Sequence, residues 1–167
     1  MLIIFGGLPA SGKSTISRQL AEKLGALYLR IDSIETAIVH SSLSVNQAED
    51  AGYFVAYSVA KDNLILGHTV IADSVNSVEI SRKAWRQVAT KQGKKFLEIE
   101  VICSDQKEHK RRLEVRNADI YDKTPIVTWE KVLQREYEVW ETVSLRLDTS
   151  QLTTKDCVQK TMGHLKM

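Results

Sequence analysis

Residues 2–15 read Leu-Ile-Ile-Phe-Gly-Gly-Leu-Pro-Ala-Ser-Gly-Lys-Ser-Thr, and the prediction of the fold rests mainly on them. Leu2–Phe5 is an uninterrupted apolar run, which predicts a short buried strand. Gly7–Ser14 follows at once and matches the full phosphate-binding pattern G-x-x-x-x-G-K-[ST]. Apolar residues then recur at every fourth position up to a stop at Gly25, as expected for an amphipathic helix. Because strand, loop and helix occur in this order, a chance match to the pattern is a poor alternative.

The loop has a physical reason for each of its defining residue types. Gly7 and Gly12 let the backbone curl so that successive N–H groups point at phosphate oxygens, and the start of the helix adds its positive end. We expect Lys13 to reach the β- and γ-phosphates and Ser14 to bind Mg²⁺. The predicted nucleotide contacts are Gly7, Pro9, Ala10, Ser11, Gly12, Lys13, Ser14 and Thr15.

Short apolar runs alternate with longer helical patterns along the whole chain. The predicted strands are Leu2–Phe5, Leu27–Ile31, Thr69–Ala72, Phe96–Cys103 and Leu145–Leu147. The later predicted helices are Asn46–Leu66, Val78–Gln92, Asp105–Asn117, Thr128–Thr142 and Thr153–Leu165. Strands separated by helices favour right-handed crossovers and a parallel sheet that is covered on both faces. The sequence therefore predicts a three-layer α/β/α protein, with one domain over residues 1–167.

Composition adds limits to the possible classes of protein. The two cysteines, Cys103 and Cys157, have no paired spacing, so neither a disulfide framework nor a zinc site is indicated. No stretch resembles a signal peptide or a membrane span, and we expect a cytoplasmic protein. Residues 82–116 hold 11 Lys/Arg against 5 Asp/Glu. Solvated helix faces and a nucleotide lid explain this basic stretch better than nucleic-acid binding does.

Two carboxylates that directly follow predicted strands are candidates for catalysis and metal binding. In parallel sheets ligands bind beyond the carboxyl ends of the strands, where these side chains would lie. Asp32 follows the second strand and is the candidate general base for an attacking hydroxyl, although Asp32–Glu35 also fits a helix-capping pattern. Asp73 follows the third strand and is predicted to hold Mg²⁺ through water, together with Ser14; the alternative is that it orients an arginine.

A basic helix precedes an irregular segment and provides candidates for a lid. His109, Arg112 and Arg116 fall on one helix face. We predict a helical lid over about 111–127, in which Arg112 contacts the nucleotide and Arg116 stabilises the transferred phosphoryl group. The alternative for any such run of basic residues is a solvated face.

Two classes of nucleotide-binding protein, guanine-specific switches and motor ATPases, are disfavoured because the chain lacks features that they require. No N-K-x-D motif for guanine recognition occurs, and 167 residues leave no room for the appendages of a motor ATPase. A small phosphotransferase needs only the loop, a base, a magnesium-organising carboxylate and mobile arginines. A regulatory module that binds ATP without phosphotransfer stays open as a second class.

Several motifs together resemble the P-loop kinases grouped around the polynucleotide 5′-kinase domain, an AAA-type family of small kinases. Zeta-type toxins, chloramphenicol phosphotransferase and gluconate-kinase-like enzymes are similar. The segments that carry the resemblance are Gly7–Thr15, Ile31–Asp32, Val70–Asn76, Arg112–Arg116, Trp129–Glu138 and Leu147–Ser150.

The resemblance implies a five-stranded sheet in the order 2-3-1-4-5, a lid after the fourth strand, and ATP with Mg²⁺. It also implies that Asp32 acts as the general base and that Arg112 and Arg116 engage phosphate. Many relatives carry an arginine soon after the aspartate, whereas this chain has an acidic Glu35 there. We therefore favour a small-molecule hydroxyl as acceptor over a nucleic-acid 5′ end. A toxin-like kinase acting on a nucleotide sugar is a further alternative, and no oligomeric state is predicted.

Overall fold

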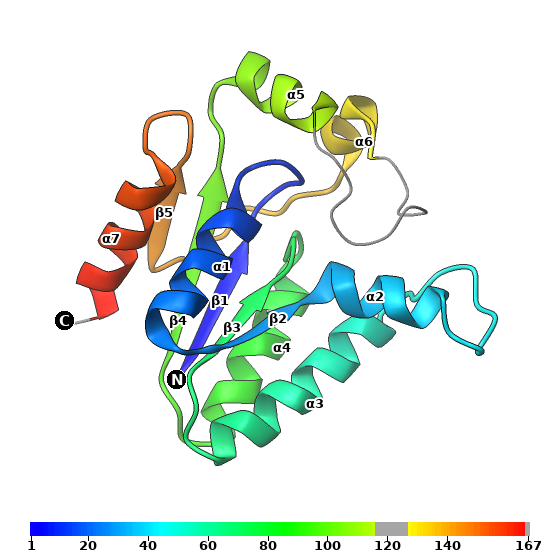
Figure 1. Cartoon of the computed structure of the whole chain (residues 1–167), viewed down its shortest axis with the longest axis vertical. Coiled ribbons are helices and arrows are strands. Elements are labelled where there is room, and N and C mark those ends of the chain that lie inside the picture. The colour runs from blue at the N-terminus through cyan, green and yellow to red at the C-terminus, as the bar shows by residue number, and fades with distance from the viewer. Residues whose placement is uncertain (116–126, 166–167) are drawn as a thin grey trace.

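The computed structural model describes residues 1–115 and 127–165, and its centre is a parallel sheet (Figure 1). The five strands are β1 Leu2–Gly6, β2 Leu27–Arg30, β3 Val70–Asp73, β4 Phe96–Ile102 and β5 Leu145–Asp148. Their order in the sheet is β2-β3-β1-β4-β5, and every neighbouring pair is parallel. The predicted strand order and sheet type are confirmed.

Helices cover both faces of the sheet and its upper edge. They are α1 Lys13–Leu24, α2 Ile31–Val39, α3 Ala51–Ile65, α4 Glu79–Thr90, α5 Gln106–Glu114, α6 Trp129–Gln134 and α7 Thr154–Leu165. In Figure 1, α1 and α7 lie on one face of the sheet and α3 and α4 on the other. The short helices α5 and α6 lie beyond the carboxyl ends of the strands. This is the predicted three-layer arrangement.

The central strand β1 shows why the apolar run at the N-terminus must be a strand. Ile3 and Phe5 pack with residues of α1 and α7, whereas Leu2 and Ile4 pack with residues of α3 and α4. Side chains alternate between the faces of a strand, so only a run that is apolar at every position can be buried on both sides. All four side chains have no exposed surface.

The register of the sheet brings three strand ends to one level. Phe5 of β1 pairs with Asp73 of β3, and Asp73 pairs with Arg30 of β2. The residues that follow these strands, including the Gly-rich loop and Asp32, therefore leave the sheet at the same edge.

Two predicted helices are shorter than the sequence indicated. The first begins at Ala51 instead of Asn46. The second, α6, ends at Gln134 instead of Thr142. The chain after α6 runs back beside the loop that follows β3. There the Glu138 backbone N–H donates a hydrogen bond of 2.8 Å to Ser77 O.

The side chain of Arg82 explains why the chain leaves the helical path after α6. Its guanidinium is fully buried and donates four hydrogen bonds, at 2.8–3.2 Å, to the backbone carbonyls of Asn76, Ser77, Glu138 and Val139. It also lies 4.6 Å from the ring centroid of Trp140, which is itself buried. Carbonyls that serve a buried arginine are not available to a helix, so these long-range contacts outweigh local helical propensity.

None of the helices in the described part of the chain is both long and apolar enough to cross a membrane.

Candidate active site

The Gly-rich loop after β1 has the backbone conformation that its glycines predict. Gly7 has φ 145° and Gly12 has φ 98°, both in the region that L side chains rarely adopt. A Cβ at Gly7 would also collide with the carbonyl oxygen of Val101. Ala10 has φ 63°, which is uncommon for a residue with a side chain and marks local strain at the loop tip.

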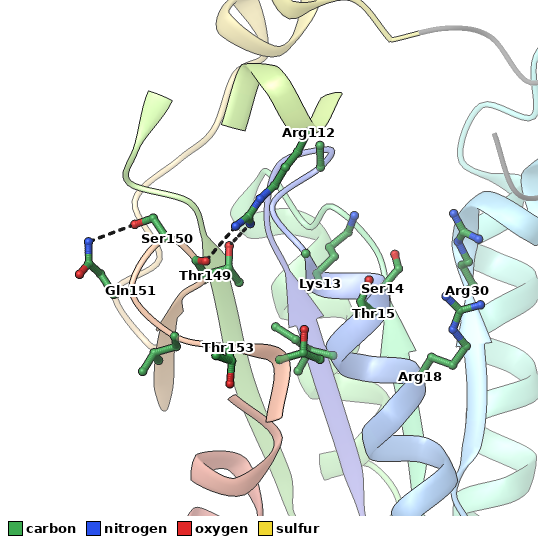
Figure 2. Close-up of a pocket in the computed structure, with 15 residues that line it drawn as sticks. Lys13, Ser14, Thr15, Arg18, Arg30, Arg112, Thr149, Ser150, Gln151 and Thr153 are labelled. Carbon is green, nitrogen blue, oxygen red and sulfur yellow. Dashed lines mark hydrogen bonds between the residues drawn. The ribbon is translucent and has the colours of Figure 1, made fainter. Parts of the chain in front are cut away.

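The loop encloses one end of a cavity of about 680 Å³ (Figure 2). The cavity lies between the start of α1 and the loop from β5 to α7. Its lining residues are Ala10, Gly12–Ile16, Arg18, Arg30, Arg112 and Thr149–Thr154. Four of these side chains are cationic, which suits a polyanionic ligand.

Lys13 and Ser14 open α1 and face this cavity, as the motif predicts. The Lys13 side chain is only 5% exposed, so its charge lies in a region that is largely screened from water. The first turn of α1 contains no acidic residue, and the positive end of the helix is left for a ligand. Of the predicted contacts, Ala10, Gly12, Lys13, Ser14 and Thr15 line the cavity.

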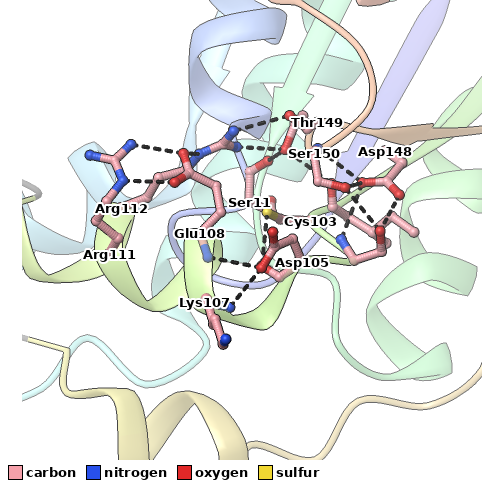
Figure 3. A network of polar contacts seen from close by, with 12 residues as sticks. Ser11, Cys103, Asp105, Lys107, Glu108, Arg111, Arg112, Asp148, Thr149 and Ser150 are labelled. Carbon is pink, nitrogen blue, oxygen red and sulfur yellow. Dashed lines mark hydrogen bonds and ion pairs between the residues drawn. The ribbon is translucent and has the colours of Figure 1, made fainter.

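Arg112 reaches the site from α5 and is held in a network of polar contacts (Figure 3). Its Nε donates to Glu108 at 2.8 Å, and its Nη1 donates to Thr149 Oγ1 at 2.8 Å. The bonds from Arg111 and Arg112 hold the pKa of Glu108 at about 2, so the carboxylate keeps its charge at neutral pH. Arg112 is thereby positioned beside the loop, whereas Arg111 is turned to the solvent.

Thr149 joins the β5 end to the Gly-rich loop, and no role was predicted for it from the sequence. Its Oγ1 donates to Ser11 O at 2.8 Å and accepts from Arg112. The signal was present, since Asp148–Ser150 is a polar cluster directly after a strand. Arg18 and Arg30 were missed as well (Figure 2); Arg18 is one helical turn beyond Ser14, and that spacing gave a usable signal.

Asp148 fixes the shape of the β5–α7 loop. Burial alone would raise the pKa of Asp148, but hydrogen bonds from the side chains and backbone of Ser104 and Ser150 outweigh it and hold the pKa at about 2. The carboxylate is therefore charged throughout the neutral range and ties the ends of β4 and β5 together.

Asp73 lies at the end of β3 and is 1% exposed. Its Oδ2 accepts a hydrogen bond of 2.6 Å from the Tyr28 hydroxyl. Burial and the Asp73 charge raise the pKa of Tyr28, which stays a neutral donor. The other oxygen, Oδ1, is buried and has no hydrogen-bond partner among the described residues. A buried carboxylate oxygen without a partner is unusual in a folded protein and is available to a ligand or an ordered water.

Asp32 lies in the first turn of α2, on the side of the sheet edge away from Thr149. It is not the N-cap residue, which is Arg30, so the predicted capping pattern is not formed. The Arg30 guanidinium lies 3.6 Å from the Asp32 carboxylate and also lines the cavity. Asp32 itself is not among the lining residues, and Arg30 is the link between the two.

Glu35 is one helical turn beyond Asp32 and packs against α3 at Gly52. Burial and the nearby Asp32 charge raise the pKa of Glu35 to about 7, and Arg135 partly opposes the shift. Burial likewise raises the pKa of the neighbouring Tyr53. This end of the site therefore combines two carboxyl groups with a neutral hydroxyl.

Arg116, most of the predicted lid and the residues 116–126 lie outside the described part of the chain. Within residues 1–115 and 127–165, no three His, Cys, Asp or Glu side chains form a group that could hold a metal ion alone. A divalent cation here would need oxygen ligands from a nucleotide and from water.

The fold and the loop together define the class of P-loop proteins with the architecture of small kinases. A family model described as "AAA domain" matches residues 2–138, and the chain belongs to this family. No curated protein sequence matches the chain.

Solved structures with the same fold span nearly the whole chain. A putative kinase from Chloroflexus aurantiacus is 22% identical with a TM-score of 0.74, covering 99% of this chain and 95% of that one. The APS kinase CysC of Mycobacterium tuberculosis, solved with AMPPNP and APS, is 20% identical with a TM-score of 0.72 and covers 99% and 97%. Kti12 of Chaetomium thermophilum, solved with ADP-AlF3, is 24% identical with a TM-score of 0.64 and covers 98% of each chain.

Proposed function

We propose that this protein is an ATP-dependent kinase that transfers the γ-phosphoryl group to a hydroxyl of a small molecule. The observation that carries the proposal is the sheet register Phe5–Asp73–Arg30, which brings a phosphate-binding loop and two strand-end carboxylates to one edge. Structures of the same fold hold a nucleotide analogue together with a small acceptor, or a nucleotide with a phosphoryl mimic, in APS kinase and Kti12 respectively.

Binding of the triphosphate is assigned to the loop and its cationic neighbours. Backbone N–H groups of the loop and the start of α1 would hold the phosphate oxygens, with Lys13 on the β- and γ-phosphates. Arg112 lines the same cavity and would neutralise charge on the nucleotide. Arg116, four residues after Arg112 in the sequence, is the side chain proposed to stabilise the transferred phosphoryl group.

Two residues after neighbouring strands, Ser14 and Asp73, fit a magnesium ion. Ser14 lines the cavity, and the buried Oδ1 of Asp73 lacks a hydrogen-bond partner within the described chain. We assign Ser14 as a direct ligand and Asp73 as a partner of a water bound to the ion. When bound, Mg²⁺ would neutralise charge that develops on the β- and γ-phosphates.

Asp32 is the proposed general base that accepts the proton of the attacking hydroxyl. Its neighbour Arg30, at 3.6 Å, lines the cavity and links the Asp32 carboxylate to it. The acceptor would bind between α2 and α3, where Glu35 and Tyr53 also lie. The Asp32 carboxylate, joined by Glu35 in the fraction of molecules in which that group is ionised near pH 7, would repel a second phosphorylated molecule, which favours a neutral acceptor over a nucleic-acid end.

The proposal is tested with γ-labelled ATP and separated fractions of metabolites and RNA from a cell extract. Wild-type protein is expected to label a component of the metabolite fraction. Asp32→Asn is expected to bind ATP normally and to transfer no label, whereas Lys13→Ala is expected to lose ATP binding. Asp62→Asn, on the exposed face of α3, is the matched control and should transfer label as wild type does.

Each other outcome identifies a different function. ATP binding without labelling of any fraction would reject the kinase and leave a nucleotide-binding regulatory module. Label in the RNA fraction alone would move the acceptor to a polynucleotide end. Growth arrest on expression that Lys13→Ala relieves, with label on a nucleotide sugar, would indicate a toxin-like kinase.

A further inference from the structure

A buried histidine of α5 is bonded to the tip of the Gly-rich loop. His109 is 5% exposed, and its Nε2 lies 2.7 Å from the carbonyl oxygen of Pro9, 100 positions away in the sequence. A carbonyl oxygen only accepts hydrogen bonds, so Nε2 carries the proton and donates. The same ring packs edge-on against Trp129 of α6, with centroids 5.2 Å apart and planes at 79°. One side chain thus joins the loop to both helices beyond the sheet edge.

This bond fixes more than the carbonyl oxygen. The Pro9–Ala10 peptide is trans, and in a trans peptide the carbonyl and the following N–H point in opposite directions. Because the Pro9 carbonyl is directed at α5, the Ala10 N–H is directed away from α5. Ala10 lines the cavity and has φ 63°, a strained conformation that needs support from its surroundings.

A second contact holds the carbonyl of the Ser11–Gly12 peptide, two peptides further along the loop. Thr149 Oγ1 donates to the carbonyl of Ser11 at 2.8 Å, and Arg112 holds Thr149 from α5 at 2.8 Å. The Ser11 carbonyl is thus also held from outside the loop, which turns the Gly12 N–H in the opposite direction. His109 and Arg112 are three residues apart on one face of α5, so a single helix face reaches both peptides.

We propose that His109 is a positioning residue of the phosphate site, which orients the Ala10 N–H toward the phosphates by holding the Pro9 carbonyl. This role rests on the proposed binding of a nucleotide in the cavity. Thr149 acts in parallel on the Ser11–Gly12 peptide. Both act through the direction of a backbone N–H; His109 is not among the residues that line the cavity, whereas Thr149 is. The donor is present in neutral and in protonated imidazole, so the role does not depend on the charge of His109.

The matched variants are His109→Phe and His109→Gln. Phenylalanine keeps an aromatic ring against Trp129 but has no donor, whereas glutamine keeps an N–H donor without the ring. Binding is measured by calorimetry for three probes: ATP with Mg²⁺, inorganic tripolyphosphate and adenosine. His109→Phe is expected to weaken tripolyphosphate and ATP by roughly 5- to 30-fold, as for the loss of one or two kcal/mol of hydrogen bonding, with adenosine unchanged. His109→Gln is expected to stay closer to wild type than His109→Phe.

A purely structural histidine would give a different pattern. Equal weakening of adenosine and tripolyphosphate, or equal effects of the two variants, would overturn the proposal. If His109→Phe fails to fold, Thr149→Val replaces it, with the same selective loss of phosphate probes expected. Unchanged tripolyphosphate binding in a folded Thr149→Val protein would count against the proposal.

A measurement without nucleotide separates this role from the proposed function. The Ala10 amide signal in ¹⁵N NMR spectra is expected to be sharp in the wild type and shifted or broadened in His109→Phe, since the peptide plane is no longer held. If the wild type binds no phosphate probe, the kinase proposal fails, and the Ala10 signal still decides whether His109 orients this peptide. An Ala10 signal that is the same in both proteins would overturn the inference.

Discussion

Glu35→Gln is expected to change how the stability of the protein depends on pH. Burial against α3 and the charge of Asp32 raise the pKa of Glu35 from an ordinary 4.5 to about 7, with Arg135 partly opposing them. The folded state therefore binds the proton more tightly than the unfolded state. Stability that is fully present near pH 4.5 is lost as the pH rises through 7, because the folded protein must then hold a partly buried second carboxylate.

The size of this effect follows from the two pKa values. The interval from 4.5 to about 7 corresponds to at most about 3.5 kcal/mol, at about 1.4 kcal/mol for each pKa unit. Glu35 is only partly buried, and solvent screening reduces the expected effect to about 1–2 kcal/mol. Glutamine is neutral at every pH. The variant should therefore exceed the wild type only slightly at pH 5 and by that amount at pH 8.

The assay is urea unfolding of both proteins at several pH values between 5 and 8, followed by tryptophan fluorescence. Glu22→Gln, on the exposed side of α1, is the matched control and should keep the pH dependence of the wild type. A difference between Glu35→Gln and the wild type that stays constant from pH 5 to pH 8 would refute the assigned pKa. A variant that is less stable than the wild type at pH 8 would show that the Glu35 carboxylate stabilises the fold.

Two further substitutions test the contacts beneath the site. Arg82→Met is expected to destabilise the protein by about 3 kcal/mol or more, because four backbone carbonyls lose their hydrogen bonds to the buried guanidinium; chemical unfolding measures the loss, and early proteolysis at 135–140 would locate it. A protein of unchanged stability would contradict the role of Arg82. Gly6→Ala is expected to cost about 1–3 kcal/mol, since a Cβ would collide with the buried ring of Trp140 and lie 3.2 Å from Val75 O. The cost should fall in a Trp140→Leu background, and a cost that stays the same would show that the ring is not its cause.

The sequence alone predicted the features that depend on local pattern. An apolar run, two glycines and a helical repeat are contiguous, so β1, the Gly-rich loop and α1 could be located to within a residue or two. The strand order came from the family resemblance, because periodicity does not say which strands are neighbours. Asp32 and Asp73 were predicted as site residues because strand ends in a parallel sheet gather at one edge; their position at that edge is observed, and their roles stay predictions.

Helix lengths were less predictable where distant residues compete with local propensity. The segment after Gln134 has a helical pattern, but its carbonyls are taken by Arg82, more than 50 residues earlier. The sequence of residues 135–140 contains nothing that indicates a hydrogen bond from so distant an arginine. Glu35 is a similar case: the burial that raises its pKa comes from packing against Gly52 of α3, a contact that the sequence around Glu35 does not indicate.

The sequence was sufficient to predict a loop with the phosphate-binding motif after the first strand, and to predict which side chains follow the strands. Only the tertiary structure decided how the loop is held: His109 and Thr149, from positions 100 and 138 residues away, bond to its carbonyls. The physical reason is that glycines permit the curled backbone but do not select one orientation of its peptides. That selection takes donors from α5 and from the loop after β5, which lie beside the Gly-rich loop only in the folded protein.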